Sequence, residues 1–214
     1  MNFLANIPFD PKTVKPSFEL EQTARSVGYS RISGIDEAGR GPLSGPVVAA
    51  AVVLDPDNIP AGLNDSKKLS AARRRVLFHE IIKVADVGVG IVSAREIDQI
   101  NILQATFLAM TRAANSLANP AEFHLIDGDK RPPALLDSSA AIVKGDARSL
   151  SVAAASIIAK VTRDRIMELA EMRWPGYGFA KHAGYGTKAH LDAIAELGPT
   201  PIHRMSFAPL KQAA

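Results

Sequence analysis

The sequence predicts an α/β protein with a mixed sheet, helices on both faces of that sheet and a small helical extension at the C-terminus. Three strand-like runs in the first half come with only one helix between them, which indicates a hairpin or meander. The later strand-like runs are short, and a long helix follows the last of them, as in crossover connections. The run at 47–54 is apolar on both faces, as in a central strand that helices cover.

Each element follows from local signals. Three prolines and no apolar periodicity predict an irregular arm over residues 1–17. Ser70 is placed to cap a helix whose apolar stripe includes Val76, and Gly198 with Pro199 closes the last helix. In chain order the expected elements are a helix at 18–27, a strand around Ile32 and Ile35, a strand at 47–54, a helix at 71–84, a strand at 86–94, a helix at 94–117, short strands at 122–126 and 140–143, a long helix at 149–172 and a helix at 187–197.

The composition excludes several classes of functional site. The 214 residues include no cysteine, which excludes a disulfide scaffold, a thiolate zinc site and a cysteine nucleophile. Any metal must therefore be held by carboxylates or histidines. The net charge of +3 permits a polyanionic partner without indicating one. The longest apolar stretch is far shorter than the about 20 residues that span a bilayer, and no secretory signal is visible. We expect a cytoplasmic protein with no membrane partner and, by default, a monomer.

Four acidic residues stand where predicted strands end. Asp36 and Glu37 end the first strand, Asp127 ends the fourth and Asp146 follows the fifth. In open α/β sheets, ligands bind at the carboxyl ends of strands. Carboxylates suit Mg²⁺, and a pair of metal ions clamps the attacking and leaving oxygens of a phosphate displacement. The four together indicate a metal-dependent site, whereas any one alone is more simply a turn or cap residue.

One geometric condition applies to the first pair. Neighbours on a regular strand point to opposite faces of the sheet. Asp36 and Glu37 are therefore expected to serve one site only if the strand ends or bulges between them, which the glycines at 39 and 41 would allow.

A glycine turn and a polar loop are candidates for substrate contact. The Gly39-Arg40-Gly41 turn matches neither a phosphate loop nor a dinucleotide fingerprint. Its backbone can nevertheless approach a sugar or phosphate closely, because Cβ is missing at two of three positions. The alternative is a tight turn between strands. Lys67 and Lys68 lie in the polar loop, where they are otherwise a solvated pair.

Two further segments carry polar or aromatic side chains in a suggestive pattern. Ser156, Lys160 and Arg163 share one face of the long helix, which suits phosphodiester contacts or is simply a solvated face. The neighbouring stripe, which includes Leu169, is assigned to the core. Segment 174–186 places aromatics among glycines and basic residues, which suits stacking on a sugar or base. For Trp174 and Phe179, a small core under a loop is the simpler interpretation.

The strings GIDEAGRGPLSGPVVAAAVVL, NDSKKLS, LIDGD, VKGDARSLSVAAASIIAKVTRDR and HAGYGTKAH, in this order, resemble bacterial ribonuclease HII, the type-two ribonuclease H. The resemblance covers about residues 31–208. It implies a ribonuclease H-like catalytic domain at 18–173 and a helical extension at 174–214 that contributes to substrate binding. It also implies endonucleolytic cleavage of RNA in RNA–DNA hybrids, and of duplex DNA 5′ of single embedded ribonucleotides, with two Mg²⁺ or Mn²⁺ ions. The products would carry 3′-hydroxyl and 5′-phosphate ends, and the role would be ribonucleotide removal in replication and repair.

The resemblance also implies roles for single residues. Metal binding and catalysis fall to Asp36, Glu37, Asp127 and Asp146. Reading of the ribose 2′-hydroxyl falls to Gly39, Arg40 and Gly41, and sensing of the RNA-to-DNA junction to Tyr185. Phosphate contact falls to Lys67, with Lys68 as the alternative, and Ser156 and Lys160 are further substrate-binding candidates. The roles of Asp129 and Asp164 stay open.

Two other functions remain open from the residues alone. One is another two-metal phosphodiesterase on the same fold, such as a DNA exonuclease or recombinase, which would lack the ribose-reading residues. The other is a noncatalytic protein that binds RNA–DNA hybrids, in which the acids would be dispensable. The presence of all four acids argues against the second.

Overall fold

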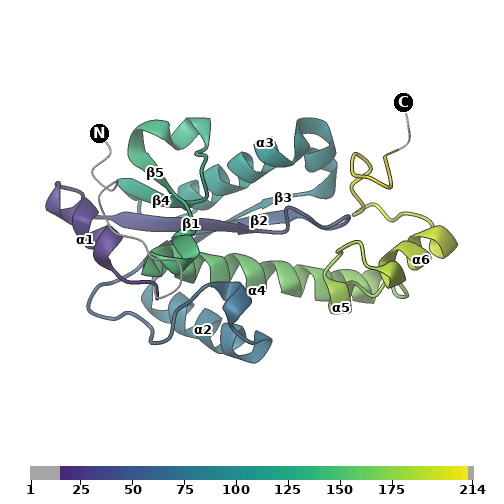
Figure 1. Ribbon diagram of the computed structural model, residues 1–214, viewed down its shortest axis with the longest axis horizontal. Coiled ribbons are helices and arrows are strands. Elements are labelled where there is room, and N and C mark those ends of the chain that lie inside the picture. Colours follow the sequence, from purple (N-terminus) through teal and green to yellow (C-terminus); the bar gives the residue numbers. More distant parts are fainter. Residues whose placement is uncertain (1–14, 212–214) are drawn as a thin grey trace.

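A computed structural model describes residues 15–211 of the chain, so most of the expected arm at 1–17 lies outside the described residues. Its centre is a five-stranded mixed sheet in the order β3-β2-β1-β4-β5 (Figure 1). The strands are β1 Ile32–Ala38, β2 Val47–Val53, β3 Asp86–Val92, β4 Phe123–Asp127 and β5 Ser139–Ile142. The first three form an antiparallel meander, and β4 and β5 lie parallel to β1. The predicted mixed α/β class is confirmed.

Helices cover both faces of this sheet. They are α1 Glu19–Ser26, α2 Ala71–Val84, α3 Ala94–Asn115, α4 Leu150–Arg173, α5 Phe179–His182 and α6 Lys188–Leu197, with 3₁₀ turns η1 Ser66–Lys68, η2 Pro133–Ser138 and η3 Gly145–Ala147. In Figure 1, α3 lies on one side of the sheet and α4 with α2 on the other. Alternate residues of β2 divide accordingly: Ala49 and Ala51 pack in the core beneath α3, and Ala50 and Val52 in the core beneath α4.

The approach of α4 to β1 is close because the strand carries a glycine there. A Cβ built at Gly34 would overlap the backbone of Ser151 and Val152 at the start of α4. The N-terminal turn of α4 is thus placed directly over β1, two residues before Asp36. This contact positions the long helix beside the end of the strand that carries the acids.

The third helix departs from the expected continuous helix at 94–117. Asn101 has φ 65° and ψ 165°, which interrupts the helical backbone inside α3. Its side-chain oxygen accepts hydrogen bonds from the amides of Leu103 (3.0 Å) and Gln104 (3.2 Å). The asparagine therefore ends one helical segment and caps the next. Apolar spacing alone did not reveal the break, because the stripe continues through it.

The assignment of Leu169 to the core is wrong, because this residue is exposed. Val76, expected on the apolar stripe of α2, is exposed as well. Leu169 lies near the C-terminal end of α4, where Met167 and Ala170 make the buried contacts instead. Ser70, by contrast, caps α2 as predicted, since its hydroxyl oxygen accepts from the amide of Arg73.

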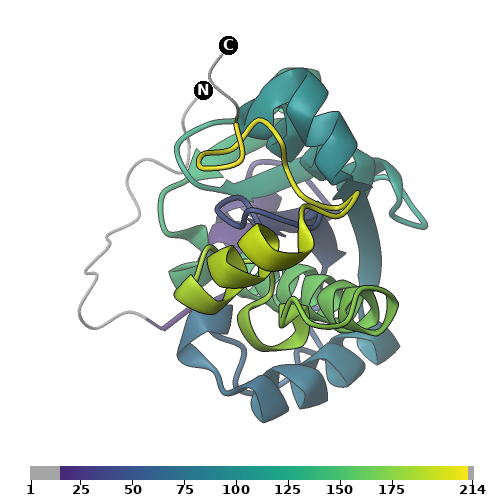
Figure 2. The ribbon, with the colours of Figure 1, turned by 90° about the vertical axis from the view of Figure 1, so that its right-hand side faces the viewer.

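The C-terminal segment forms a small core of its own against the end of α4. Phe179 is fully buried there with Met167, Ala170, Tyr177 and Ala193, and Trp174 packs against this cluster. The expected small core is confirmed, although the single turn α5 was not predicted. Figure 2 shows α6 and the tail after it lying across the end of the molecule, in front of the turn between β1 and β2.

None of the helices within residues 15–211 is both long and apolar enough to cross a membrane.

Candidate active site

Three of the four predicted acids are brought together by the parallel part of the sheet. The register pairs Ile35 of β1 with Ile126 of β4, so that Asp36 and Asp127 come next on adjacent strands. Asp146 lies in η3, directly after β5, and β5 flanks β4 on its other side. The backbone amide of Gly145 donates to Oδ1 of Asp127 at 2.7 Å, which ties η3 to the end of β4. The carboxyl ends of three parallel strands thus meet at the edge where open α/β sheets bind their ligands.

Glu37 joins the other acids in a different way from that expected. The strand neither ends nor bulges after Asp36, since Glu37 pairs with Ala49 and Ala38 with Val48 in unbroken register. The strand end or bulge that one shared site was expected to require is therefore absent from β1. The neighbouring strand β4 ends at Asp127, so no strand covers β1 on that side of Glu37. The charge of Glu37 accordingly acts on both Asp36 and Asp127.

The acids raise one another's pKa. Asp36 is 7% exposed, and burial together with the charges of Glu37, Asp127 and Asp146 raises its pKa well above the ordinary value. Burial and the charge of Glu37 raise the pKa of Asp127. Burial and the charge of Asp127 raise the pKa of Asp146 to about 6. Like charges brought together in a poorly solvated site produce this pattern.

The donor chemistry of this cluster fits a hard divalent cation. All four side chains offer carboxylate oxygens, and their mutual repulsion is what a bound cation relieves. Three of the carboxylates are already engaged: Asp36 accepts from the amide of Glu37 (2.7 Å), Asp127 from Gly145, and Glu37 from the guanidinium of Arg40 (3.2 Å). Within residues 15–211, no three Asp, Glu, His or Cys side chains form a ready-made coordination group.

A fifth acid and a lysine also face the cluster. Burial alone would lower the pKa of Lys67, but the charges of Asp36, Asp146 and Asp65 raise it overall. The side chains of Asp65 and Asp146 hydrogen-bond to each other, which contributes to the raised pKa of Asp146. Asp65 is not among the site residues predicted from the sequence. Its only local signal is its position before the Ser-Lys pair, where its carboxylate caps η1 by accepting from the amide of Lys67 at 2.8 Å.

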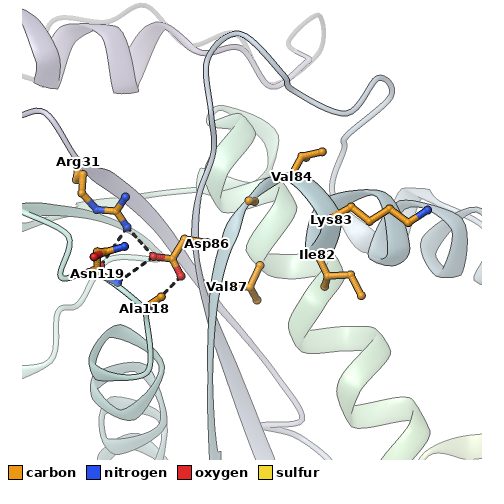
Figure 3. A pocket seen from close by; sticks show the side chains of 9 residues that line it. Arg31, Ile82, Lys83, Val84, Asp86, Val87, Ala118 and Asn119 are labelled. Atoms are coloured by element: carbon orange, nitrogen blue, oxygen red, sulfur yellow. Dashed lines mark hydrogen bonds and ion pairs between the residues drawn. The ribbon is translucent and has the colours of Figure 1, made fainter.

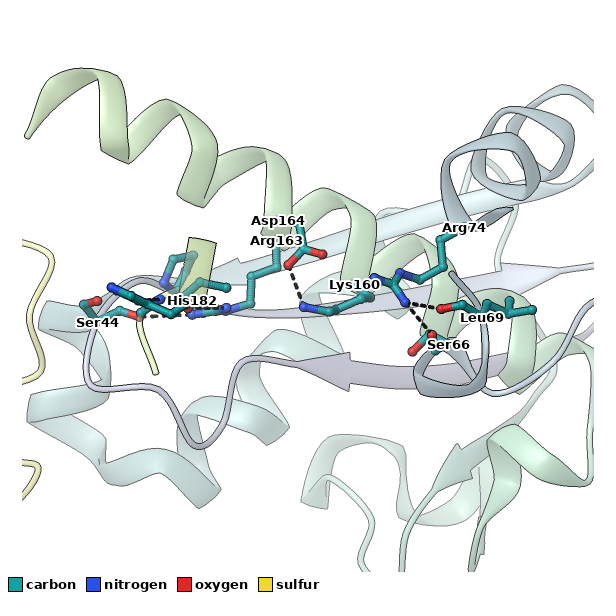
Figure 4. A network of polar contacts seen from close by, with 11 residues as sticks. Ser44, Ser66, Leu69, Arg74, Lys160, Arg163, Asp164 and His182 are labelled. Atoms are coloured by element: carbon teal, nitrogen blue, oxygen red, sulfur yellow. Dashed lines mark hydrogen bonds and ion pairs between the residues drawn. The ribbon is translucent and has the colours of Figure 1, made fainter. Parts of the chain in front are cut away.

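The loop that carries Lys67 is fixed from below by α4 and α2. The amide of Ser66 donates to Oγ of Ser156 at 3.3 Å, and Nη1 of Arg74 donates to the carbonyls of Ser66 (2.8 Å) and Leu69 (2.6 Å). Figure 4 shows the contacts of Arg74 with Ser66 and Leu69 at one end of a set of polar contacts beside α4. Ser156 is only 3% exposed, and its hydroxyl donates to the carbonyl of Ala153. The structure therefore places Ser156 beneath the loop.

The predicted face of Ser156, Lys160 and Arg163 is not a solvated face. Arg163 is buried, and its guanidinium donates to three backbone carbonyls. Lys160 is partly exposed and forms an ion pair with Asp164 at 2.6 Å, one turn further along α4. This pair accounts for one of the two acids whose role the sequence left open. The other, Asp129, is exposed beyond the end of β4.

The glycine turn and Tyr185 lie side by side at the rim of the site. Gly39 has φ 95°, a conformation that glycine adopts without strain. A Cβ built at Gly41 would lie 3.6 Å from the ring of Tyr185, and that ring is 49% exposed. The backbone amide of Leu43 donates to the carbonyl of Gly184 at 2.8 Å, which joins the two segments. Arg40 is tied to Glu37, so the turn also touches the acidic cluster.

A second polar site lies at the opposite end of the sheet. Figure 3 shows Arg31 and Asp86 in a pocket with Asn119, before the start of β1 and at the start of β3. The guanidinium of Arg31 and the carboxylate of Asp86 form an ion pair at 2.6 Å, and Asp86 also accepts from the amides of Ala118 and Asn119. These contacts join β3 to the loop after α3. They lie far along β1 from Asp36.

Comparison with known proteins agrees with this site. The family model described as Ribonuclease HII matches residues 33–210. A ribonuclease HII from Rhizobium etli is 55% identical over 204 residues, which are 95% of this chain and 89% of that protein. One from Parvibaculum lavamentivorans is 56% identical over 195 residues, or 91% of this chain and 71% of that protein.

Solved structures agree as well. The ribonuclease H2 of Pyrococcus horikoshii is 31% identical with a TM-score of 0.70, over 85% of this chain and 96% of that one. The ribonuclease HII of Archaeoglobus fulgidus, solved in a complex with PCNA, is 30% identical with a TM-score of 0.69, over 86% of this chain and 98% of that one. With its sheet order, its acids at strand ends and these relatives, the chain belongs to the ribonuclease HII family and is a ribonuclease H.

Proposed function

We propose that this ribonuclease H cuts duplex DNA 5′ of single embedded ribonucleotides as well as the RNA strand of RNA–DNA hybrids. Membership of the family supports endonuclease activity on RNA–DNA hybrids. The finer activity is supported chiefly by one observation: Asp36, Asp127 and Asp146 lie where three parallel strands end, with Glu37 beside them, and burial together with the charges of neighbouring acids raises the pKa of each of these three aspartates. The reaction would be hydrolysis by water and would leave 3′-hydroxyl and 5′-phosphate ends. We further propose that the protein acts as a cytoplasmic monomer in ribonucleotide removal during replication and repair.

The four acids are proposed to hold two Mg²⁺ or Mn²⁺ ions. Bound there, such ions would supply an activated water and stabilise the leaving oxygen. Because Asp36 and Asp127 are held by backbone amides, their carboxylates are oriented before any ligand arrives. Lys67 faces the same acids from the fixed loop at 64–69, where its ammonium group would hold a substrate phosphate beside them.

Ribose recognition is proposed to depend on the glycine turn and on Tyr185. The 2′-hydroxyl is the local group that distinguishes ribose from deoxyribose. Backbone groups of Gly39, Arg40 and Gly41 are proposed to reach it. The missing side chain leaves room at Gly41, where only the ring of Tyr185 lies near, whereas at Gly39 the corresponding space is filled by Arg163. The exposed ring of Tyr185, beside Gly41, would stack on the next sugar and disfavour a second hydroxyl there. Specificity for an RNA-to-DNA step follows from this pair.

Phosphate contacts are proposed to continue from the acids along α4. A groove of about 360 Å³ beside Lys160 is lined by several further cations: Arg74, Arg75, Arg165 and Lys181. Asp164 and Glu168 also line it, so its charge is only partly positive. Lys160 could leave Asp164 for a phosphate at small cost, because a partly exposed ion pair contributes about 1 kcal/mol or less.

The test is cleavage of three labelled duplexes of one sequence: all DNA, DNA with a single ribonucleotide, and an RNA–DNA hybrid. With Mg²⁺ or Mn²⁺, we expect cutting of the second and third but not of the first, and a cut 5′ of the ribonucleotide when the product ends are mapped. Tyr185→Ala should lower the rate on the singly substituted duplex more than on the uniform hybrid, which has no junction within reach. Equal cutting of all three duplexes would instead support a general two-metal phosphodiesterase. Binding without cutting would support a noncatalytic protein.

A further inference from the structure

Among residues 15–211, two arginines are buried without a carboxylate that hydrogen-bonds to them. Arg204, in the tail after α6, is 0% exposed, and Arg163, in α4, is 1% exposed. Burial lowers the pKa of both guanidinium groups, that of Arg204 to about 9. Burying a charge is costly unless hydrogen bonds replace the lost water. The groups that these two arginines bind therefore show what their burial achieves.

Arg204 binds the glycine turn itself. Its Nη2 donates to the carbonyl of Gly39 (2.5 Å) and its Nη1 to the carbonyl of Arg40 (2.8 Å). Its Nε and Nη2 both donate to the carbonyl of Gly45, at 3.0 Å and 2.9 Å. One planar guanidinium thus fixes the directions of three carbonyls in the connection between β1 and β2. A lysine ammonium could not bind all three in this arrangement, because its donors diverge from a single nitrogen.

Arg163 binds the other half of the same connection and joins it to the segment of Tyr185. Its Nε donates to the carbonyl of Pro46 (3.0 Å) and its Nη2 to that of Ser44 (3.0 Å). Its Nη1 donates to the carbonyl of Ala183 at 2.9 Å, two residues before Tyr185. Figure 4 shows Arg163 reaching from α4 toward Ser44. The helix that covers the sheet therefore also sets the distance between the turn and the tyrosine.

The tail that carries Arg204 supports Tyr185 by a second route, through two histidines. Nδ1 of His203 accepts from the amide of Thr200 (2.8 Å), so its proton lies on Nε2. That Nε2–H donates to Nε2 of His190 (3.1 Å), and the Nδ1–H of His190 then donates to the carbonyl of Tyr185 (2.9 Å). Only this arrangement of protons satisfies all three contacts. The tail is itself anchored to α3, where Asp98 accepts from the amides of Met205 and Ser206, both at 2.9 Å.

We propose that Arg204 and Arg163 are positioning residues for ribose recognition, which make the C-terminal tail and α4 part of the reader of the 2′-hydroxyl. The inference rests on the proposed role of the glycine turn and Tyr185. Neither arginine touches the substrate. They hold the backbone of Gly39 and Arg40 at a fixed orientation relative to the ring of Tyr185 and to the acids at the end of β1. A displacement of about 1 Å at such a site can cost about 100-fold in rate.

The experiment compares Arg204→Ala and Arg204→Lys with Arg31→Ala as a matched control. Arg31 also donates to two backbone carbonyls and to one acid, but at the opposite end of the sheet. We expect Arg204→Ala to lose about 10- to 100-fold in kcat on the singly ribo-substituted duplex, with a smaller change in KM. Arg204→Lys should recover little of this loss. Arg31→Ala should keep the wild-type kcat even though it lowers the melting temperature.

Chemical rescue separates positioning from stability. Methylguanidinium fits the space left by Arg204→Ala, so low millimolar concentrations should raise the activity of this variant and not that of Arg204→Lys or Arg31→Ala. Amide hydrogen exchange of residues 39–46 gives a readout that is independent of activity. Exchange there should speed up in Arg204→Lys, whose charge is kept, while exchange in β3 stays unchanged. If Arg204→Ala does not fold, Arg204→Lys supplies the kcat measurement and the exchange measurement, without the rescue.

Two outcomes would overturn separate claims. If the wild-type protein fails to cut the ribo-substituted duplex, the proposed function is wrong, and the exchange data on residues 39–46 still report whether Arg204 orders the turn. If the wild-type protein cuts and a folded Arg204→Lys has the same kcat and the same exchange in the turn, the proposed role of Arg204 is wrong while the proposed function stands.

Discussion

At the scale of single residues, the acidic cluster that is proposed to bind metal lowers the stability of the metal-free fold. Asp36 is buried among three other carboxylates, so its ionised form is unfavourable in the folded protein. A carboxyl whose pKa is raised on folding stabilises the fold most at low pH, and that contribution is lost as the pH rises through the folded pKa. The charged cluster is therefore expected to weaken the metal-free protein at neutral pH. Residues arranged for chemistry commonly have this cost.

Asp36→Asn should lower the cleavage rate by about 100-fold or more. The same substitution should stabilise the metal-free protein. The amide keeps the shape of the side chain but removes the repulsion with Glu37 and Asp127. The melting temperature at neutral pH should rise by roughly 2–4 °C for each kcal/mol of repulsion relieved. Thermal unfolding with a chelator present, alongside the cleavage assay, measures both effects. Asp129→Asn removes an exposed acid nearby and should change neither; a lower melting temperature for Asp36→Asn would contradict the electrostatic account.

Metal activation should depend on pH in a definite direction. The pKa of Asp146 is about 6 and that of Asp127 is also raised, so protons compete with a cation more strongly as the pH falls. The concentration of Mg²⁺ that gives half-maximal activity should therefore be higher at about pH 5.5 than at about pH 7.5, by up to about tenfold per pH unit for each proton displaced. Titrations of activity with Mg²⁺ at several pH values check this. A half-maximal concentration that does not change with pH would show that these carboxyls do not bind the ion.

At the scale of elements, α3 shows how a side chain can divide a helix that apolar spacing presents as continuous. Asn101 adopts a backbone conformation with φ 65° that most side chains disfavour, and it restarts the helix by accepting two amide hydrogen bonds. The stripe of small residues Ala105, Ala109 and Ala113 then lies flat on the sheet. The break at Asn101 thus sets the orientation of the second segment of α3, which covers one face of the sheet.

Asn101→Ala should destabilise the protein by about 1–3 kcal/mol, because it removes the cap and leaves the strained backbone. Asn101→Gly should cost less, since glycine tolerates the positive φ and loses only the cap. Asn101→Asp keeps an oxygen in place and should remain close to wild type. Urea unfolding of the three variants measures the order, and equal stability of the alanine and glycine variants would show that the backbone is not strained there.

At the scale of the whole molecule, buried neutral histidines make global stability sensitive to acid. His124 in β4 is buried against Ser33, and burial lowers its pKa to about 4. A histidine whose pKa is lowered on folding contributes fully above its unfolded pKa of about 6.5, and this contribution is lost as the pH falls toward 4. The loss amounts to about 3 kcal/mol over that window.

His124→Asn should flatten this dependence, because the amide cannot titrate and still offers an oxygen to the hydroxyl of Ser33. Urea unfolding at pH values between about 6.5 and 4 should show a smaller fall in unfolding free energy for the variant than for the wild type. Parallel curves for the two proteins would mean that His124 titrates normally in the folded state. His79, which lies exposed on α2, offers a control through His79→Asn, whose curve should follow that of the wild type.

The sequence by itself determined the chain order of the five strands and of the longer helices, the placing of Asp36, Asp127 and Asp146 at strand ends, and the family. These follow from local periodicity and from short strings of residues, which a reader of the chain can see directly. Only the tertiary structure decided that β1 continues in unbroken register through Glu37, whose charge acts on Asp36 and Asp127, and that Ser156 lies under the Lys67 loop. It also decided that Arg204 holds Gly39, a residue 165 positions earlier. Spacing along a helix or strand fixes the face on which a side chain lies, but the group that a long side chain meets depends on how distant segments pack.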